Sequence, residues 1–258
     1  MKSYINLSFL TLLFISSSSS AQKSDSIKYI SNFSGSVSVT HNGLSFIPTF
    51  SLGQPAAIFN LSLGNRKLSF EPEMRFSLEG KPWSFLFWWR YKIYKTDKFK
   101  INLGAHPALN FKTTNVPING ISGEYVITRR YLAAEIVPSF TLSKNISLGM
   151  YYLYSIGLDP GTTKNTHFLT LNTSFTNIRL AKKIVMRLVP QVYYLRLDQQ
   201  EGYYYSTSVN IARKNFPLSV SAIINKAINT EIPSKPFVWN TSLVYTFNQK
   251  YAKIRQAL

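Results

Sequence analysis

The feature that most constrains the fold is an alternation of apolar and other residues that recurs from residue 44 to residue 247. Each copy covers about ten residues, a length typical of one barrel strand, and a turn follows it. The clearest copy is WSFLFWWRYKIY at residues 83–94, whose even positions include Ser84, Arg90 and Lys92. Successive side chains of a strand point to opposite sides. The pattern therefore predicts strands with one apolar face and one face that accepts charge.

The N-terminal residues 1–21 have the pattern of a secretory signal peptide. Lys2 gives a positive start, residues 7–15 form an apolar core, and Ser19 and Ala21 are the small residues that a signal peptidase requires. We expect cleavage near Ala21. The prediction is a signal peptide at 1–21, a single barrel domain at 22–247 and a basic C-terminal tail at 248–258.

The chain contains no cysteine, which excludes disulfides, thiolate metal sites and a cysteine nucleophile. Export combined with many amphipathic strands predicts an all-β fold, a transmembrane antiparallel up-and-down β-barrel of 12 strands in the bacterial outer membrane. Fourteen strands are the alternative count, and a soluble periplasmic β-sandwich is the alternative fold. The predicted strands are residues 44–52, 56–63, 68–78, 83–94, 99–111, 125–142, 146–158, 167–175, 184–197, 203–212, 218–228 and 237–247.

Residues 34–40 also alternate, and we interpret them as the lower half of a long, kinked first strand. Counting them separately gives thirteen strands and moves the long loops to the periplasmic end, where turns are normally short. With twelve strands from residue 44, the long connections 112–124, 159–166 and 229–236 all fall at one end. The tight turns near Gly64, Lys95, Ser143 and Lys214 fall at the other.

Aromatic residues recur near the ends of the predicted strands, as expected of the two girdles that a barrel places at the membrane–water boundaries. The girdle candidates are Trp83, Trp89, Tyr91, Tyr152, Tyr154, Tyr194, Tyr203, Tyr205, Trp239, Tyr245 and Phe247. Four prolines, Pro72, Pro107, Pro138 and Pro190, share the apolar parity and predict bulges or bends, because proline lacks a ladder donor.

The opposite parity carries polar and charged residues, which should face the lumen because a charge in mid-bilayer lipid costs about 2–4 kcal/mol. The candidates for lumen lining and solute contact are Glu71, Glu73, Arg75, Arg90, Lys92, Lys100, His106, Asn110, Lys112, Arg129, Glu135, Arg187, Gln191 and Tyr193. Glu71 and Glu73 could serve acid–base chemistry, but the nearby arginines favour an ion-pair network.

No motif predicts a cofactor or a metal site. His106 is interpreted as a polar lumen residue. His167 has outward parity near an outer loop, as in an outer-membrane lipid hydrolase, but residue 169 is leucine and neither Ser174 nor Ser206 has a defined relation to it. We therefore predict no catalytic residues and no enzyme activity, with a lipid hydrolase as a third alternative.

The chain has 29 Lys and Arg residues against 11 Asp and Glu, a net charge of +18. Such an excess suits nucleic acid, an anionic membrane surface or an anionic solute. The export signal argues against nucleic acid. Outer-membrane lipid, lipopolysaccharide and a small anionic solute are the partners we expect.

The alternating FLFWWRY segment, the signal ending Ser19-Ser20-Ala21-Gln22 and the final strand WNTSLVYTF resemble the small outer-membrane β-barrel proteins of Gram-negative bacteria. The resemblance covers the whole mature chain. It implies that the barrel assembly machinery reads the aromatic end at Phe247, although eleven residues follow it here. Twelve-stranded members include anion-selective oligosaccharide porins, nucleoside channels and lipid hydrolases, so the fold does not choose the function.

Two functions are favoured. One is a narrow channel or uptake pore whose basic lumen favours small anionic solutes. The other is a plugged structural or binding barrel. Its outer loops, residues 113–124 especially, would hold a partner or a lipopolysaccharide phosphate through Arg129 and Arg130.

Overall fold

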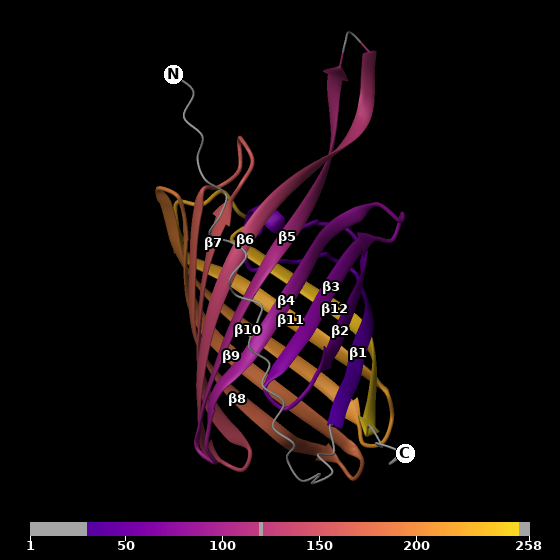
Figure 1. The fold of residues 1–258 in the computed structure, drawn as a ribbon, viewed down its shortest axis with the longest axis vertical. Coiled ribbons are helices and arrows are strands. Elements are labelled where there is room, and N and C mark those ends of the chain that lie inside the picture. Colours follow the sequence, from indigo (N-terminus) through magenta and orange to yellow (C-terminus); the bar gives the residue numbers. More distant parts are fainter. Residues whose placement is uncertain (1–29, 119–120, 253–258) are drawn as a thin grey trace, which may run out of the picture.

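The computed structural model describes residues 30–118 and 121–252, and the predicted signal peptide lies outside them. Within these residues twelve antiparallel strands form a closed barrel, in which each strand pairs with its sequence neighbours and β1 pairs with β12 (Figure 1). The strands are β1 (Ile30–Thr40), β2 (Ala56–Gly64), β3 (Leu68–Ser77), β4 (Pro82–Lys95), β5 (Phe99–Ile118), β6 (Ile121–Ser143), β7 (Ile146–Gly157), β8 (Asn165–Ala181), β9 (Ile184–Leu197), β10 (Gln200–Arg213), β11 (Leu218–Thr230) and β12 (Phe237–Ala252). The predicted fold class and strand number are confirmed.

The two ends of the barrel differ as the loop lengths predicted. β1 begins and β12 ends at the lower end in Figure 1, where the turns are short. The upper end carries the longer connections 41–55, 158–164 and 231–236. It also carries the β5–β6 hairpin, which projects beyond the other strands (Figure 1). The predicted loop at 113–124 was wrong in form, because these residues extend the ladder to the pair Ile118–Ile121.

The first strand differs from the prediction. Residues 34–40 belong to β1, whereas residues 44–52 form no strand and instead contain the short 3-10 helix η1 (Pro48–Phe50). Pro48 has no N–H for a ladder, and Gly53 has a φ of 76°, which favours glycine. The first strand therefore consists of its predicted lower half alone, the predicted upper half at 44–52 was wrong, and the count stays at twelve.

At each of the four prolines, pairing with one neighbouring strand is interrupted over two residue pairs, as the missing ladder donor predicts. The register does not shift there. Register shifts occur elsewhere, for example between Arg75 and Phe76 on β3 and between Lys92 and Tyr94 on β4, so the bulges that were predicted at the prolines lie at other positions. At the C-terminal end, β12 continues past Phe247 to Ala252 and pairs with β1 there. The wall therefore includes residues 248–252, which the sequence analysis assigned to the tail.

No helix among the described residues is long and apolar enough to cross a membrane. The barrel closes by pairing alone, which leaves no unpaired edge around its wall, although the projecting β5–β6 hairpin extends beyond its neighbouring strands.

Candidate functional site

The interior of the barrel is the candidate site, because the buried Glu135 and several half-buried charged side chains meet there. Arg90 of β4 lies between two carboxylates. Its Nε donates to Glu135 Oε1 at 2.6 Å, and its Nη1 donates to Glu71 Oε2. Arg75 pairs with Glu73 on β3. The predicted lumenal ion-pair network is therefore present, and it neutralises the central arginines.

The position of Glu135 depends on a glycine in the strand between it and Arg90. A Cβ on Gly104 of β5 would lie 2.6 Å from Glu135 Oε1, closer than a Cβ atom approaches a non-bonded atom in real proteins. Only glycine leaves room for this carboxylate, whose side chain is 1% exposed. A buried carboxylate without its cation is costly, so Arg90 and Glu135 depend on each other.

His106 lies beside this network. It is 5% exposed, and its ring lies 3.9 Å, centroid to centroid, from Trp88. Its Nδ1 is 3.1 Å from the carbonyl oxygen of Pro107. The interpretation of His106 as a polar lumen residue fits these contacts. No group of three metal-ligating side chains occurs in the part of the chain that the structure describes.

The remaining lumen candidates separate by height. Lys92, Lys100 and Arg187 lie toward the lower end, and no ion pair involves them within residues 30–118 and 121–252. Asn110, Lys112 and Arg129 lie toward the upper end, and Gln191 lies below Tyr193 on β9. The free basic groups are therefore at the two mouths of the barrel rather than in its middle.

Tyr193 belongs to an apolar cluster that the sequence did not predict. Its ring stacks on Tyr204 at 4.8 Å, and its hydroxyl donates to Asn225 Oδ1 at 2.9 Å. The buried members of this interior cluster are Trp88, Ala133, Leu153, Phe168, Tyr193, Leu195, Leu197, Tyr204 and Ile232. Most lie in the upper half of the barrel, where an aqueous channel would have polar walls.

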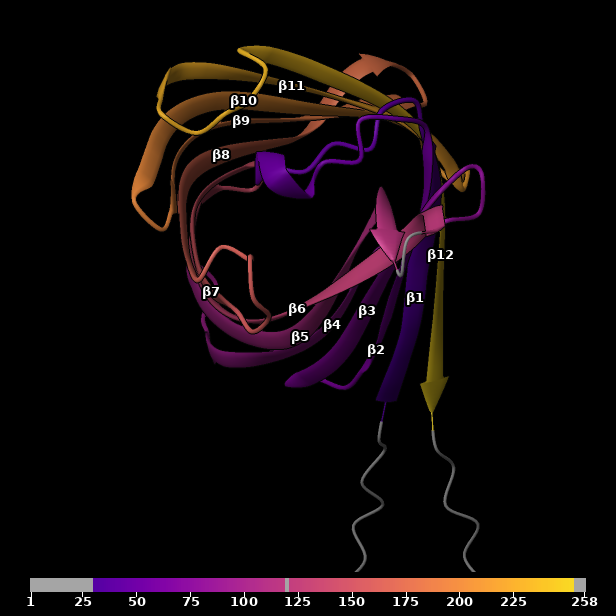
Figure 2. The same cartoon turned by 90° about the horizontal axis from the view of Figure 1, so that it is seen from above.

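The inserted segment, residues 41–55, explains the apolar cluster. Figure 2 shows η1 inside the ring of strands. Phe46 packs against Phe168 and Tyr193, with ring centroids at 6.1 and 5.7 Å. Phe50 meets Tyr131 edge to face at 4.9 Å. The segment's apolar residues are therefore half-buried against the inner wall, and the segment occupies the upper lumen.

Hydrogen bonds hold the inserted segment in shape. Leu52 N donates to Gly43 O at 2.8 Å, and Ser45 N donates to Ser51 Oγ at 2.9 Å. Trp83 of β4 donates through Nε1 to Phe50 O at 2.7 Å. These bonds join the two ends of the segment and tie its middle to the wall.

Trp83 was predicted in the girdle, and this was wrong. It is 2% exposed and lies under the Arg75 guanidinium at 4.9 Å. It is the extra residue of the bulge between the pairs Arg75–Ser84 and Phe76–Pro82, so its side chain turns to the inner face.

The other girdle candidates are exposed or half-exposed on the outer face. Trp89, Tyr91, Tyr203, Trp239 and Tyr245 are all more than 40% exposed. The less exposed Tyr152 and Tyr194 also lie on this face, as do Tyr154, Tyr205 and Phe247. The Phe247 ring lies over Gly35 and 5.3 Å from the Phe33 ring.

Cavities remain on both sides of the inserted segment. One of about 360 Å³ lies between the segment and the wall from β3 to β8. Another of about 250 Å³ lies toward β10–β12 and is lined by Ser208, Ser221, Asn240 and Ser242. A third, of about 600 Å³, lies at the upper mouth among Thr49, Lys81, Lys112 and Glu124. The segment narrows the lumen without filling it.

His167 faces outward, as its parity predicted. Tyr152 Oη lies 2.9 Å from its Nδ1, and the Tyr154 ring is 5.0 Å away. Ser174 and Ser206 are buried on the inner side, where Arg187 Nε donates to Ser174 Oγ and Ser206 donates to Ile224 O. Neither serine shares a face with His167, so the triad geometry of a hydrolase is not formed with them.

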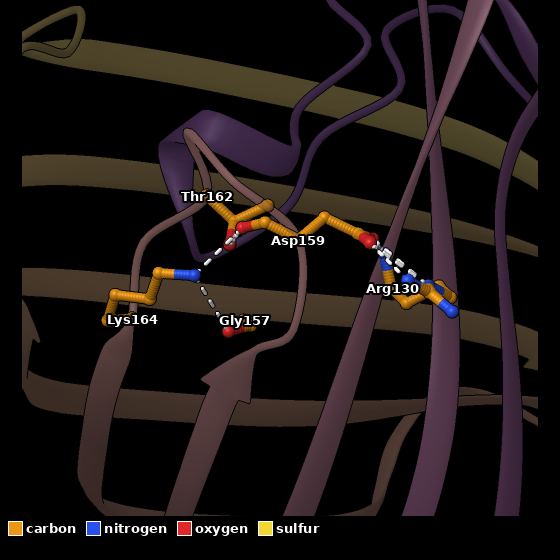
Figure 3. A network of polar contacts seen from close by, with 5 residues as sticks. All are labelled: Arg130, Gly157, Asp159, Thr162 and Lys164. Carbon is orange, nitrogen blue, oxygen red and sulfur yellow. Dashed lines mark hydrogen bonds and ion pairs between the residues drawn. The ribbon is translucent and has the colours of Figure 1, made fainter.

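Arg129 and Arg130 are neighbours on β6 and therefore project to opposite faces, which prevents them from holding one phosphate together. Arg130 is bound to Asp159 of the β7–β8 loop, with Nη2 2.6 Å from Oδ1 and its backbone N 2.6 Å from Oδ2 (Figure 3). These bonds hold the pKa of Asp159 below its usual value. Lys164 and Thr162 donate to the Asp159 carbonyl, which fixes the loop.

The barrel is similar to solved outer-membrane channels. It superposes on the KdgM porin with a TM-score of 0.51 and 10% identity, covering 83% of this chain and 99% of that one. An outer-membrane channel from Pseudomonas putida F1 superposes with a TM-score of 0.49 and 10% identity, covering 85% of this chain and 95% of that one. The NanC porin superposes with a TM-score of 0.48 and 9% identity, covering 85% of this chain and 100% of that one. No family model matches the chain, and no curated protein sequence matches it. The chain has the fold of an outer-membrane β-barrel.

Proposed function

We propose that this protein is a narrow channel of the bacterial outer membrane whose upper lumen is constricted by the inserted segment. The observation that carries the proposal is the pair of lumenal cavities, of about 360 and 250 Å³, that flank the segment. A structural plug would be expected to close this space with side chains. Both cavities also have polar groups in part of their walls, which a path for solutes requires.

The charge distribution supports small anions as the solutes. Lys92, Lys100 and Arg187 line the lower half without carboxylate partners in the described part of the chain, while the central arginines are neutralised. A low-dielectric wall concentrates the field of such groups and raises the local concentration of anions. The positive charge at the mouths would therefore attract anionic solutes.

The outer face supports the proposed location. Large apolar side chains are exposed along the strands, and a groove of about 610 Å³ lined by Phe99, Phe140, Leu148 and Leu171 runs over them. Exposed apolar surface of this extent suits contact with lipid acyl chains. Lipid is therefore the partner that we propose for the wall.

Planar-bilayer recording tests the channel. We expect small single-channel steps, and a salt gradient should give a reversal potential of the sign that anions produce. The double variant Lys92→Glu, Lys100→Glu should shift that potential toward cations. Lys226→Glu is the matched control, because Lys226 is exposed on the outer face opposite Tyr205 and Phe237. A refolded barrel without conductance would refute the channel.

The plugged barrel is the second candidate, and the packing of Phe46 on Phe168 and Tyr193 favours it. It predicts a silent wild-type barrel that conducts only after the inserted segment has been replaced.

A further inference from the structure

The cavity between the inserted segment and β3–β8 has the dimensions and lining of a small-molecule site. Its volume of about 360 Å³ lies at the lower end of the range for ligand pockets, roughly 300–1,000 Å³, so it fits a compact ligand. Like such pockets, it is lined mainly by apolar side chains with a few polar groups at one end.

The polar end of this cavity is a row of three side chains that lie side by side on neighbouring strands. Arg75 of β3, Ser84 of β4 and Asn110 of β5 are consecutive register partners, and all three line the cavity. Ser84 is 6% exposed, and its hydroxyl is the one buried side-chain polar atom of the described residues without a hydrogen-bond partner. An unpaired buried hydroxyl destabilises the folded state, so this group is expected to have a hydrogen-bond partner.

The charges near the cavity are already paired. Arg75 holds Glu73, and Arg90 holds Glu71 and Glu135, which leaves two cations against three carboxylates. An anionic ligand would need to break one of these pairs, because no surplus cation is present to receive it. The central site therefore disfavours anions, in contrast to the basic mouths.

The apolar end consists of aromatic and aliphatic side chains from both the segment and the wall. Phe46, Ile47 and Phe50 face Leu86 and Phe168 across the cavity. Aromatic side chains pack favourably against the edge or face of another ring. A ligand with one ring and a polar group at one end would match both ends of the site.

The lumenal cavity adjoins the cavity at the upper mouth. The cavity of about 600 Å³ at that mouth shares Phe50 and Asn110 with the lumenal one. Phe50 is tied to the wall by the hydrogen bond from Trp83 and by its ring contact with Tyr131, so displacement of this one residue would connect the two cavities.

We propose that this cavity binds small, uncharged aromatic alcohols, with the ring against Phe46, Phe50 and Phe168 and the hydroxyl on Ser84 and Asn110. A hydroxyl can donate to and accept from these groups at once. The inference goes beyond the proposed function, since it gives the central cavity a ligand class other than the small anions proposed for conduction. Binding is measurable without conduction, however, so the two proposals fail separately.

The test is calorimetric titration of the folded barrel in detergent with benzyl alcohol, toluene and benzoate. Partition of the probes into micelles is removed by subtracting the titration of Ala108→Phe, which fills the cavity from β5. We expect binding in the order benzyl alcohol, toluene, benzoate, and none for Ala108→Phe. Tight binding of benzoate, or equal heats for wild type and Ala108→Phe, would overturn the proposal.

Two further variants separate the role of the hydroxyl from folding. Ser84→Ala should weaken benzyl alcohol about fivefold, the equivalent of one hydrogen bond, and leave toluene unchanged. Ser84→Thr keeps the hydroxyl and should retain the preference for the alcohol over toluene. Heat-modifiable gel migration shows that each variant is folded. An unchanged alcohol-to-toluene ratio in Ser84→Ala would refute the assignment of Ser84. Binding in a silent barrel would remove the channel and keep the site.

Discussion

The upper and lower halves of the barrel interior differ although the same strands build both. The upper half holds the inserted segment against aromatic residues such as Tyr131, Phe168 and Tyr193. The lower half has small polar inner residues at the register partners of the same strands: Ser34, Ser36, Asn60, Ser62, Ser69, Asn102, Ser139, Ser147, Asn172, Ser174, Asn210 and Ser219. One wall thus combines a packed core with a polar, basic passage.

The difference shows why strand alternation alone does not define a lumen. Alternation predicts whether a side chain faces the inside or the outside of the barrel. It does not predict whether an inward-facing side chain contacts water or the inserted segment. Phe168 and Ser174 lie on the same inner face of β8, and only the height along the strand separates their environments. The function of such a barrel depends on what covers its inner face at each height.

The largest expected effect comes from removing the contents of the upper half. Replacing residues 44–52 with a glycine–serine linker of equal length should raise single-channel conductance severalfold, because the constriction is lost. Planar-bilayer recording measures this. Thr49→Ser, at an exposed position of the same segment, is the control and should leave conductance unchanged. Equal conductance of the linker variant and wild type would show that the segment constricts nothing.

The ion-pair network at the boundary of the two halves should contribute strongly to stability. Glu135→Ala leaves Arg90 with only one carboxylate, and breaking a buried pair costs about 3 kcal/mol. Urea unfolding of the barrel in lipid vesicles measures the loss. Glu124→Ala breaks the exposed pair with Lys81, at a cost of less than about 1 kcal/mol. Similar losses for both variants would contradict the buried role of Glu135.

A smaller effect is expected where the wall holds the segment. Trp83→Phe keeps an aromatic ring but removes the hydrogen bond to Phe50 O, worth about 1 kcal/mol. We expect more frequent transitions to a larger conductance in single-channel traces. Trp89→Phe alters an exposed tryptophan on the outer face and serves as control. If both variants gate alike, the bond from Trp83 does not hold the segment.

The smallest effect concerns the β7–β8 loop. Arg130 lowers the pKa of Asp159, so the folded state binds this proton less readily than the unfolded state. The stabilising contribution is present above the ordinary pKa of an aspartate and is lost as pH falls through the lowered value. The protection factor of the Arg130 amide, which donates to Asp159, should therefore fall only in acid once hydrogen exchange is corrected for its intrinsic pH dependence. In Asp159→Asn the exchange should no longer show this acid step; a persisting step would assign it elsewhere.

Strand number and inner parity could be predicted because lipid imposes the same requirement along every strand. Residues 44–52 were wrongly predicted as a strand because their apolar residues alternate. Those side chains pack against the apolar cluster inside the barrel, not against lipid. Hydrophobic periodicity does not identify which surface buries a side chain. A connection could have been predicted from the glycine and proline residues in and around this segment, namely Gly43, Pro48, Gly53 and Pro55.

The arrangement of the site could not be predicted without knowing the register between the strands. Arg90 and Glu135 lie on strands separated by β5, and they meet only because Gly104 lies between them. Trp83 changed faces because one bulge shifts the parity of a single residue. Neither fact follows from composition or spacing, since both depend on which residues oppose each other across the wall.

The division of the interior can be tested most directly by thiol labelling, since the chain has no cysteine of its own. Ser219→Cys places a thiol on the inner face of the lower half, and Ser155→Cys places one in the cavity beneath the segment. With a hydrophilic maleimide, Ser219→Cys should react rapidly. Ser155→Cys should be protected until residues 44–52 are replaced by the linker. Equal labelling of the two positions, or protection of Ser155→Cys that survives the replacement, would contradict the account.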